Sequence, residues 1–142
     1  AVLQAIHTAG VLGDIAAANV NVDMIVQNVG ADGSTDFTFT VHRGDYRKAL
    51  ETLQKTAGQL AAREVTGDDK IAKISVVGVG MRSHAGIASQ MFKTLADEGI
   101  NIQMISTSEI KISVVVEEKY LELAVRTLHS SFGLDKPAAP AR

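Results

Sequence analysis

The chain has 142 residues, of which 46% are hydrophobic, 4% aromatic and 21% charged, and its formal net charge is −2. This amount of apolar side chain can bury a core, so we expect a globular chain and not a disordered one. A basic stripe is missing and aromatic residues are few, which argues against nucleic-acid binding. The lack of cysteine excludes disulfides, thiolate metal sites and a cysteine nucleophile. No apolar run is long enough to cross a bilayer, so we expect a cytoplasmic protein with no membrane partner.

A repeat of whole segments organises the chain. Residues 21–28 are echoed by residues 101–108, and residues 36–41 are echoed by residues 111–116. A stretch with helical spacing of apolar residues follows each copy, and the first copy has a longer turn, residues 30–35. Each copy is therefore predicted to contain a helix, two strands and a second helix.

The second helix of the first copy is predicted to begin behind Asp45, a residue type suited to capping it. Residues 63–66 indicate a short final strand, and residues 67–69 indicate a boundary turn. The apolar positions of this helix are Tyr46, Ala49, Leu50 and Leu53.

The second copy is predicted to start with a strand at residues 71–79. A helix over residues 86–98 follows, and Gly99 is suited to close it. Strands are predicted at residues 101–107 and 110–116. The positions expected to face inward are Ile110, Ile112, Val114 and Val116 on the last strand, and Leu121, Ala124, Val125, Leu128 and Phe132 on the last helix.

A repeated βαββα(β) unit predicts an α+β fold of the ferredoxin-like βαββαβ type, in which an antiparallel sheet carries two helices on one face. We place the first domain at residues 1–66, the second at residues 67–134 and a disordered tail at residues 135–142. Free sheet edges can pair, so the two units are expected to pack side by side.

The turn at residues 80–86 links a strand to the start of a helix. Its glycines let the backbone approach a ligand, and the N–H groups at a helix start favour a carboxylate. An ordinary tight turn explains the same residues. The turn matches neither the dinucleotide fingerprint nor the P-loop pattern.

Catalytic and metal chemistry find little support. Ser83 and His84 are adjacent in sequence, a spacing that rarely gives serine–base geometry, and no nucleophile elbow surrounds them. The histidines are isolated and lack the spacing of metal ligands. We therefore predict no catalytic residue, no metal site and no cofactor.

Polar residues recur at the strands that follow the first helices. Asn21 and Asn101 hold equivalent places, which indicates either a repeated turn or a strand start that faces the glycine turn and holds an ammonium group. Gln27 and Asn28 lie in an apolar strand, at a sheet edge or a ligand contact. Asp23 is either an exposed residue or a counter-charge to an ammonium ion. The positions expected in the core are Met24, Ile25, Met104 and Ile105.

Four segments together indicate a family. Residues 22–29, 35–40, 73–86 and 105–114 closely resemble the C-terminal regulatory region of bacterial aspartate kinases, and the likeness extends over roughly residues 11–134. The chain is most similar to the threonine-responsive type, whose regulatory region also occurs as a separate subunit.

The resemblance implies two tandem ACT domains without the amino-acid kinase domain, so this chain should not itself phosphorylate aspartate with ATP. It implies an amino-acid effector, threonine first and lysine second, at an ACT–ACT interface that usually lies between chains. The implied partners are a second copy of the chain and a kinase catalytic domain or subunit. The implied effector residues are Asn21, Val22, Asp23 and Gln27 in the first domain, and Met81, Arg82, Ser83, His84, Ala85, Gly86, Ile87, Asn101, Ile102 and Thr107 in the second, with Gly30 and Thr35 nearby.

The opening residues depart from the family pattern. The family has a strand and a D-x-P-G turn before the first helix, and residues 1–10 contain no such motif. Residues 8–11 resemble residues 84–87, but the spacing to the next strand is then about one helical turn short. The alternative is that the opening strand and turn are missing or replaced. The family also completes its second sheet with a borrowed N-terminal strand, so a sheet edge is expected to be open.

We expect the effector to act by favouring one arrangement of subunits. The rival interpretations are an ACT module that serves dimerisation without an effector, an RNA-binding ferredoxin-like domain and a hydrolase. The low charge and the missing strand aromatics disfavour RNA binding.

Overall fold

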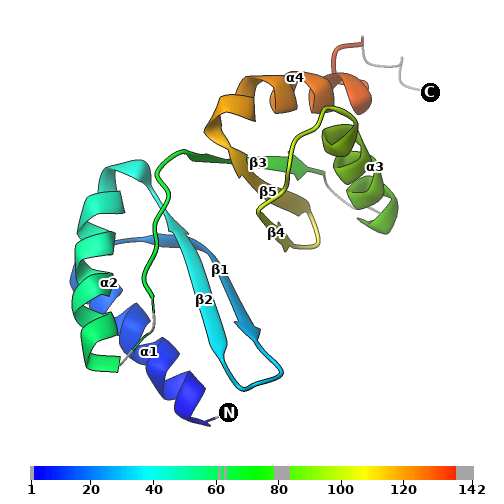
Figure 1. Ribbon diagram of the computed structural model, residues 1–142. Coiled ribbons are helices and arrows are strands. Elements are labelled where there is room, and N and C mark those ends of the chain that lie inside the picture. Colours follow the sequence, from blue (N-terminus) through cyan, green and yellow to red (C-terminus); the bar gives the residue numbers. More distant parts are fainter. Residues whose placement is uncertain (1, 61, 63, 79–83, 137–142) are drawn as a thin grey trace. The chain divides into compact units, whose positions relative to one another are not determined.

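The computed structural model describes residues 2–60, 62, 64–78 and 84–136 (Figure 1). The chain divides into two compact units, unit 1 at residues 1–69 and unit 2 at residues 70–142. In the part of the chain so described, no helix has the length and apolar character needed to span a membrane.

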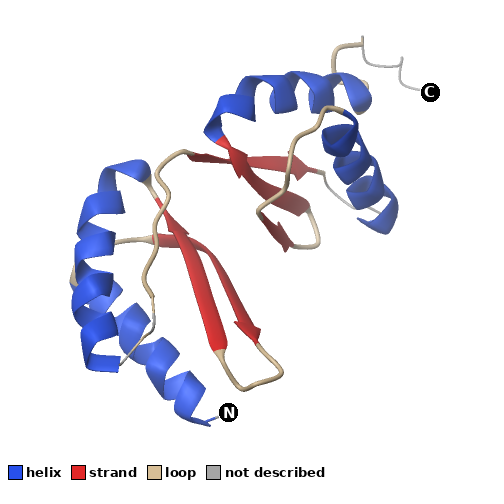
Figure 2. Cartoon of the chain, in the orientation of Figure 1, coloured by secondary structure: helices blue, strands red, loops and turns tan. Residues whose placement is uncertain are grey.

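Unit 1 has the predicted order of helix, strand, strand and helix. Its elements are α1 (Val2–Ala17), β1 (Val22–Val29), β2 (Thr35–Val41), a 3₁₀ turn (Arg43–Asp45) and α2 (Tyr46–Leu60). The two strands form an antiparallel hairpin, with Ile25 opposite Phe39. In Figure 2 both helices lie to one side of this hairpin. The longer turn predicted for the first copy is confirmed: the Gly30 N–H donates to the Ser34 carbonyl over 2.7 Å, and Gly33 has a φ of +86°.

The core of unit 1 is small among the side chains that the structure describes. Ile15, Val20 and Ala49 are its buried members. The half-buried side chains packed against them are Ala18, Val22, Phe39, Val41 and Leu53. The two helices are also joined by a polar contact, in which the Thr56 hydroxyl donates to Asp14 Oδ2 over 2.6 Å.

Unit 2 has the same order of elements behind an additional first strand. Its elements are β3 (Ile71–Val77), α3 (His84–Asp97), β4 (Met104–Thr107), β5 (Lys111–Glu117), a 3₁₀ turn (Glu118–Tyr120) and α4 (Leu121–Ser131). The sheet order is β3-β5-β4, and β5 is antiparallel to both neighbours. The buried core joins this sheet to both helices through Ile74, Met91, Leu95, Ile100, Ile112, Val114, Val116, Ala124 and Leu128. The inward positions predicted at Ile112, Val114 and Val116 are therefore confirmed, and Phe132 packs against the same core.

The first helix of each unit ends in the same way. Gly99 has a φ of +71° and Asn19 a φ of +61°. The next residue returns a hydrogen bond into the last helical turn, from Ile100 N–H to the Leu95 carbonyl over 2.9 Å and from Val20 N–H to the Ile15 carbonyl over 3.2 Å. Both pairs are buried, so each helix end contributes a residue to its core. The predicted role of Gly99 is confirmed.

Several expectations about the elements are wrong. Residues 64–66 carry no regular secondary structure, and Arg63 lies outside the described residues. Ile110 is 51% exposed, because β5 begins one residue later and Ile110 belongs to the preceding turn. Leu121 and Val125 are 38% and 47% exposed, since the buried side of α4 is formed by Ala124 and Leu128. β4 begins at Met104 and not at residue 101.

The start of the expected disordered tail is also ordered. The Asp135 carboxylate accepts a hydrogen bond from the Ser130 hydroxyl over 2.7 Å, and the Lys136 N–H donates to the Gly133 carbonyl over 3.3 Å. These bonds form a turn that closes α4. The rest of the expected tail, residues 137–142, lies outside the described residues.

Candidate functional site

The first turn of α3 is the described part of the predicted carboxylate site. Met81, Arg82 and Ser83 lie outside the described residues, and α3 begins at His84, two residues earlier than predicted. Ala85 and Gly86 are exposed on this turn. The next residue, Ile87, is half-buried and packs against the core of unit 2, which fixes the direction of the turn. The start of a helix carries partial positive charge, so this turn suits an anion.

Asn101 and Ile102 lie at the other end of α3. The helix has 14 residues and is about 21 Å long, and the chain reaches Asn101 only after it. Ile102 packs against the core, and the next residue is tied to β5 by a bond from Gln103 N–H to the Val115 carbonyl over 2.8 Å. The expectation that this strand start faces the glycine turn is therefore not met within unit 2.

Thr107 lies at the same end of the sheet as the start of α3. It ends β4 opposite Ile112, and Ile112 in turn pairs with Val76 near the end of β3, from which the chain proceeds to α3. The Gly78 N–H donates to the Ile110 carbonyl over 2.8 Å and ties this end together. An exposed hydroxyl and a helix start therefore share one end of unit 2.

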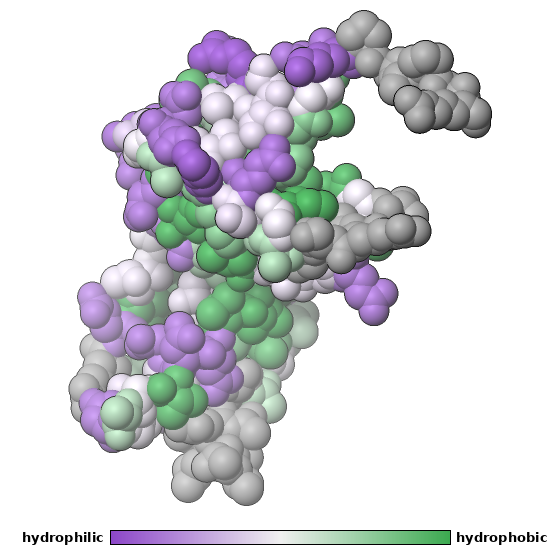
Figure 3. All heavy atoms as spheres, turned by 90° about the vertical axis from the view of Figure 1, so that its right-hand side faces the viewer, coloured by the Kyte–Doolittle hydropathy of each residue, from purple (hydrophilic) through white to green (hydrophobic). Residues whose placement is uncertain are grey.

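Apolar side chains reach the surface near this end. Val77, Ile105 and Ile110 are 63%, 46% and 51% exposed. Ile105 was expected in the core, but it lies on the edge strand, where no further strand covers it in the part of the chain described. Figure 3 shows one face of the molecule, on which apolar side chains reach the surface among hydrophilic ones. This end of unit 2 can thus offer both polar and apolar contacts to a small zwitterion.

The counterparts in unit 1 are found by adding 80 to the residue number. Asn19 then matches Gly99, Asn21 matches Asn101 and Gln27 matches Thr107, and each pair has the same place in its unit. Asn21, Asp23 and Gln27 are exposed, while Val22 packs against the core of unit 1.

Burial in β1 differs from the expectation. Gln27 and Asn28 are both exposed, so they do not form a buried polar pair. Met24 is buried as expected, but Ile25 is 50% exposed. The Gln27 amide therefore lies on a strand surface that a ligand or a second sheet can reach.

Unit 1 has no described counterpart of the helix start. The same offset of 80 places the partner of Gly86 at Ile6, inside α1. Residues 8–11, which resemble residues 84–87, also lie inside this helix. Both segments are thus helical, but residues 84–87 form the first turn of α3, whereas residues 8–11 lie within α1.

Gly30 and Thr35 bound the hairpin turn of unit 1. A Cβ on Gly30 would lie 2.7 Å from both Asp32 Oδ1 and Ser34 Oγ, so a side chain there would require these two side chains to move. The Ser34 hydroxyl and N–H both donate to Asp32 Oδ1, over 2.6 and 3.0 Å. The hydroxyl bond, followed by the backbone bond, holds the pKa of Asp32 below its ordinary value. The turn is thus fixed by its own side chains.

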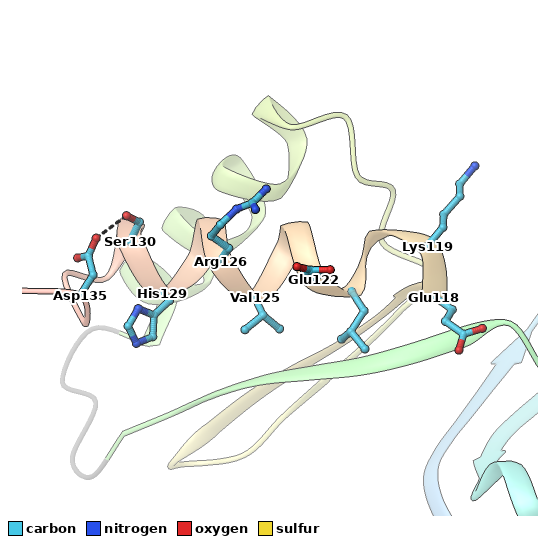
Figure 4. Close-up of a pocket in the computed structure, with 9 residues that line it drawn as sticks. Glu118, Lys119, Glu122, Val125, Arg126, His129, Ser130 and Asp135 are labelled. Carbon is cyan, nitrogen blue, oxygen red and sulfur yellow. Dashed lines mark hydrogen bonds between the residues drawn. The ribbon is translucent and has the colours of Figure 1, made fainter.

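A shallow hollow of about 800 Å³ runs along α4 (Figure 4), and none of the predicted site residues is among those that line it. It is lined by Glu118, Lys119, Leu121, Glu122, Val125, Arg126, His129, Ser130 and Asp135. Val125 and His129 point to the same side of the helix. α4 contacts β3, whose outer edge carries no strand in the described chain. The exposed Leu121 and Val125 fit the open sheet edge that the sequence led us to expect. Among the described residues, no group of three or more acidic or histidine side chains could hold a metal ion.

Comparisons with known proteins give the family. Residues 74–132 match the model of an ACT domain family. The chain is 71% identical over 128 residues to an aspartokinase of Pseudomonas aeruginosa, and the match covers 90% of this chain and 31% of that protein. The chain thus spans about a third of the length of this relative.

Solved structures agree. A crystal structure of aspartokinase alpha and beta subunits matches with 56% identity and a TM-score of 0.82, over 89% of this chain and 82% of that one. The ligand-free regulatory subunit of aspartate kinase from Thermus thermophilus matches with 36% identity and the same TM-score, over 89% and 83% of the two chains. The resemblance inferred from the sequence is confirmed, and the chain belongs to the ACT-domain regulatory subunits and regulatory regions of aspartokinase.

Proposed function

We propose that this chain is the effector-binding regulatory part of an aspartate kinase. It binds an end-product amino acid, with threonine as the first candidate and lysine as the second. This binding changes the activity of a kinase catalytic domain or subunit. The observation that carries the proposal is the shared end of unit 2, where the start of α3, the Thr107 hydroxyl and exposed apolar side chains occur together in a member of this family.

The α-carboxylate of the amino acid binds at the first turn of α3, where N–H groups and the helix dipole favour negative charge. The Thr107 hydroxyl can donate to the ligand or accept from it. Ile105 and Ile110 offer apolar surface to a short aliphatic side chain. Threonine can use all three contacts, through its carboxylate, its polar groups and its short aliphatic side chain.

The ammonium group needs acceptors from elsewhere, because α3 keeps Asn101 away from its own first turn. We assign these acceptors to a second copy of the chain, through the exposed Asp23 carboxylate and Gln27 amide of its unit 1. A ligand held in this way joins two copies and favours the arrangement that brings them together. A homodimer that is tightened by its effector follows from this assignment.

Calorimetric titration with threonine, lysine, methionine and isoleucine tests the proposal. Threonine should release heat and raise the melting temperature, and a concentration of 100 Kd should add about 2.7 kcal/mol to the free energy of unfolding. No heat and no thermal shift with any of the four would refute an effector role. In the same preparation, ATP and aspartate should give no phosphorylated product.

A matched pair of variants tests Gln27. Gln27→Ala should weaken threonine binding, whereas Gln54→Ala, which removes an exposed amide from α2 of the same unit, should leave it unchanged. Equal affinities for both variants would remove Gln27 from the site.

A second candidate function is an ACT module that dimerises without an effector. It is favoured by α1, which runs as a continuous helix through the place where unit 1 would carry its own ligand turn. Sedimentation would support it by showing a dimer that added amino acids do not change.

A further inference from the structure

The turn between β1 and β2 contains the only aspartate–glycine pair of the sequence, Asp32–Gly33. Every other aspartate and every asparagine of the sequence is followed by a residue with a side chain. A side chain on the following residue hinders the approach of its backbone nitrogen to the preceding carboxyl group, and glycine has none. Asp32, Gly33 and Ser34 are exposed, so water reaches the pair. Rearrangement of the backbone is therefore least hindered at this position.

An aspartate followed by glycine can isomerise through a cyclic imide. The Gly33 nitrogen attacks Cγ of Asp32, a nitrogen–carbon bond forms, and the amide proton leaves with the side-chain hydroxyl as water. Water then adds back and opens the ring. Opening at Cγ restores aspartate, whereas opening at the main-chain carbonyl gives isoaspartate, in which the backbone runs through Cβ and Cγ. The reaction thus needs a neutral carboxyl group and a backbone nitrogen that can release its proton.

The folded turn holds both of these groups in unreactive states. The Gly33 N–H donates to the Gly30 carbonyl over 3.0 Å, so the proton of the attacking nitrogen is already bound. The Asp32 Oδ1 atom accepts from the Ser34 hydroxyl over 2.6 Å and from the Ser34 N–H over 3.0 Å. The hydroxyl bond, followed by the backbone bond, lowers the pKa of Asp32 and favours the charged carboxylate, from which no hydroxyl can leave.

We propose that Asp32–Gly33 is a site of isoaspartate formation and that Ser34 protects this site in the folded turn. Attack requires the Gly33 N–H to leave the Gly30 carbonyl. It also requires the Asp32 carboxylate to take up a proton, which weakens both bonds from Ser34. The opened turn is therefore the reactive form, and its population sets the rate of isomerisation.

Isomerisation at Asp32 would damage the hairpin of unit 1. It adds a carbon atom to the main chain between Gly30 and Ser34, whose N–H and carbonyl close the turn with a bond of 2.7 Å. The strand ladder begins directly beyond this bond, with Val29 opposite Thr35. The longer backbone would disturb this pairing. The damage would thus fall on the hairpin that carries Gln27, whatever ligand that residue binds.

Timed incubation of the full chain at neutral pH tests the site. Isoaspartate at Asp32 is measured by peptide mapping with electron-transfer fragmentation, for the chain in buffer and for the chain unfolded in guanidinium chloride. The folded chain should react at least about threefold more slowly, the ratio expected when the reaction waits for one exposed hydrogen bond to open. Gly33→Ala should abolish the signal in guanidinium chloride. Equal rates in the two solutions would overturn the protection, and no isoaspartate at Asp32 in the unfolded chain would overturn the site.

Substitutions of serine test the role assigned to Ser34. In buffer, Ser34→Ala should raise the rate at Asp32 by about threefold, whereas Ser34→Thr, which keeps a hydroxyl, should stay near the original rate. Ser108→Ala, in the corresponding turn of unit 2, is the matched control and should have no effect. Circular dichroism would confirm that the variants are folded, and all of them should react alike in guanidinium chloride. If Ser34→Ala reacted no faster in buffer than Ser34→Thr and Ser108→Ala, Ser34 would not protect the pair.

Discussion

Unit 1 and unit 2 share a pattern of elements but differ in how much they bury. Among the side chains that the structure describes, the buried cluster of unit 2 has nine members and that of unit 1 has three. Unit 2 has three strands and unit 1 has two in the described part of the chain. In unit 2, β5 is the central strand, and its inward residues Ile112, Val114 and Val116 are fully buried. In unit 1, β2 pairs only with β1, and its inward residues Phe39 and Val41 are half-buried.

In this pair of units, the strand with two neighbours has the more completely buried apolar face. The alternating pattern specifies which side chains share a face, and the elements packed on that face decide how far those side chains are buried. β3 gives β5 its second partner, and Ile74 of β3 joins the core directly. β2 has the same kind of alternating pattern but one strand partner among the described residues, and the described core of its unit is small.

Truncation of one equivalent core residue in each unit should have the largest effect. Leu95 and Ile15 precede the matching helix ends and are 0% and 1% exposed. Leu95→Ala should cost about 4 kcal/mol, because its cavity is enclosed by a large core, and Ile15→Ala only about 2 kcal/mol, because a small core can collapse around the gap. Urea unfolding with residue-specific NMR signals from each unit measures both values. Equal losses would mean that the two cores are equally well packed.

A smaller effect is expected where polar side chains join the two helices of each unit. Thr56 and Ser131 hold corresponding places in the last helices, and Asp14 and Thr94 in the first. Thr56 is 4% exposed and donates to a carboxylate over 2.6 Å, whereas Ser131 and Thr94 share a neutral hydroxyl contact of 2.9 Å.

Because hydrogen bonds to charged groups are the stronger ones, Thr56→Val should cost about 1.5 kcal/mol and Ser131→Ala about 0.5 kcal/mol. Chemical denaturation at neutral pH measures the two losses. Thr52→Val is a useful control, since its hydroxyl donates only to the Lys48 carbonyl within its own helix. If Ser131→Ala lost more free energy of unfolding than Thr56→Val, the neutral contact would be the stronger of the two, contrary to the prediction.

Sequence patterns predicted the order and type of the helices and strands well. They predicted less well which strands lie at a sheet edge and which side chains are buried. The repeat gave the order of helices and strands, and Gly99 marked a helix end because its conformation is one that side chains disfavour. Asn19 ends the other first helix in the same conformation, and only its match to Gly99 could have indicated that. Ile25 and Ile105 were wrongly expected in the core, because apolar character alone does not tell an edge strand from a central one.

The candidate site was predictable only in parts. The start of α3 could be located to within two residues from glycine and helix signals, and the paired Asn21 and Asn101 from the repeat. Asn101 lies away from the first turn of α3 because the whole length of the helix separates the two. Sequence patterns describe near neighbours, so they did not indicate this separation.

The smallest effect concerns the turn between the two hairpin strands, which is longer in unit 1 than in unit 2. The bonds from Ser34 lower the pKa of Asp32, so the charged carboxylate favours the folded turn. Its contribution is present above the ordinary pKa of 3.8 and is lost as the pH falls through the lowered value. Ser34→Ala removes the hydroxyl bond, which is the largest cause, and leaves the backbone bond, so the pKa of Asp32 should rise part of the way back. Carboxyl-detected NMR titration measures this shift, and Ser108→Ala in the corresponding turn of unit 2 should leave it unaltered. If the pKa of Asp32 stayed the same in Ser34→Ala, the backbone alone would fix the turn, and the longer loop of unit 1 would owe nothing to its serine.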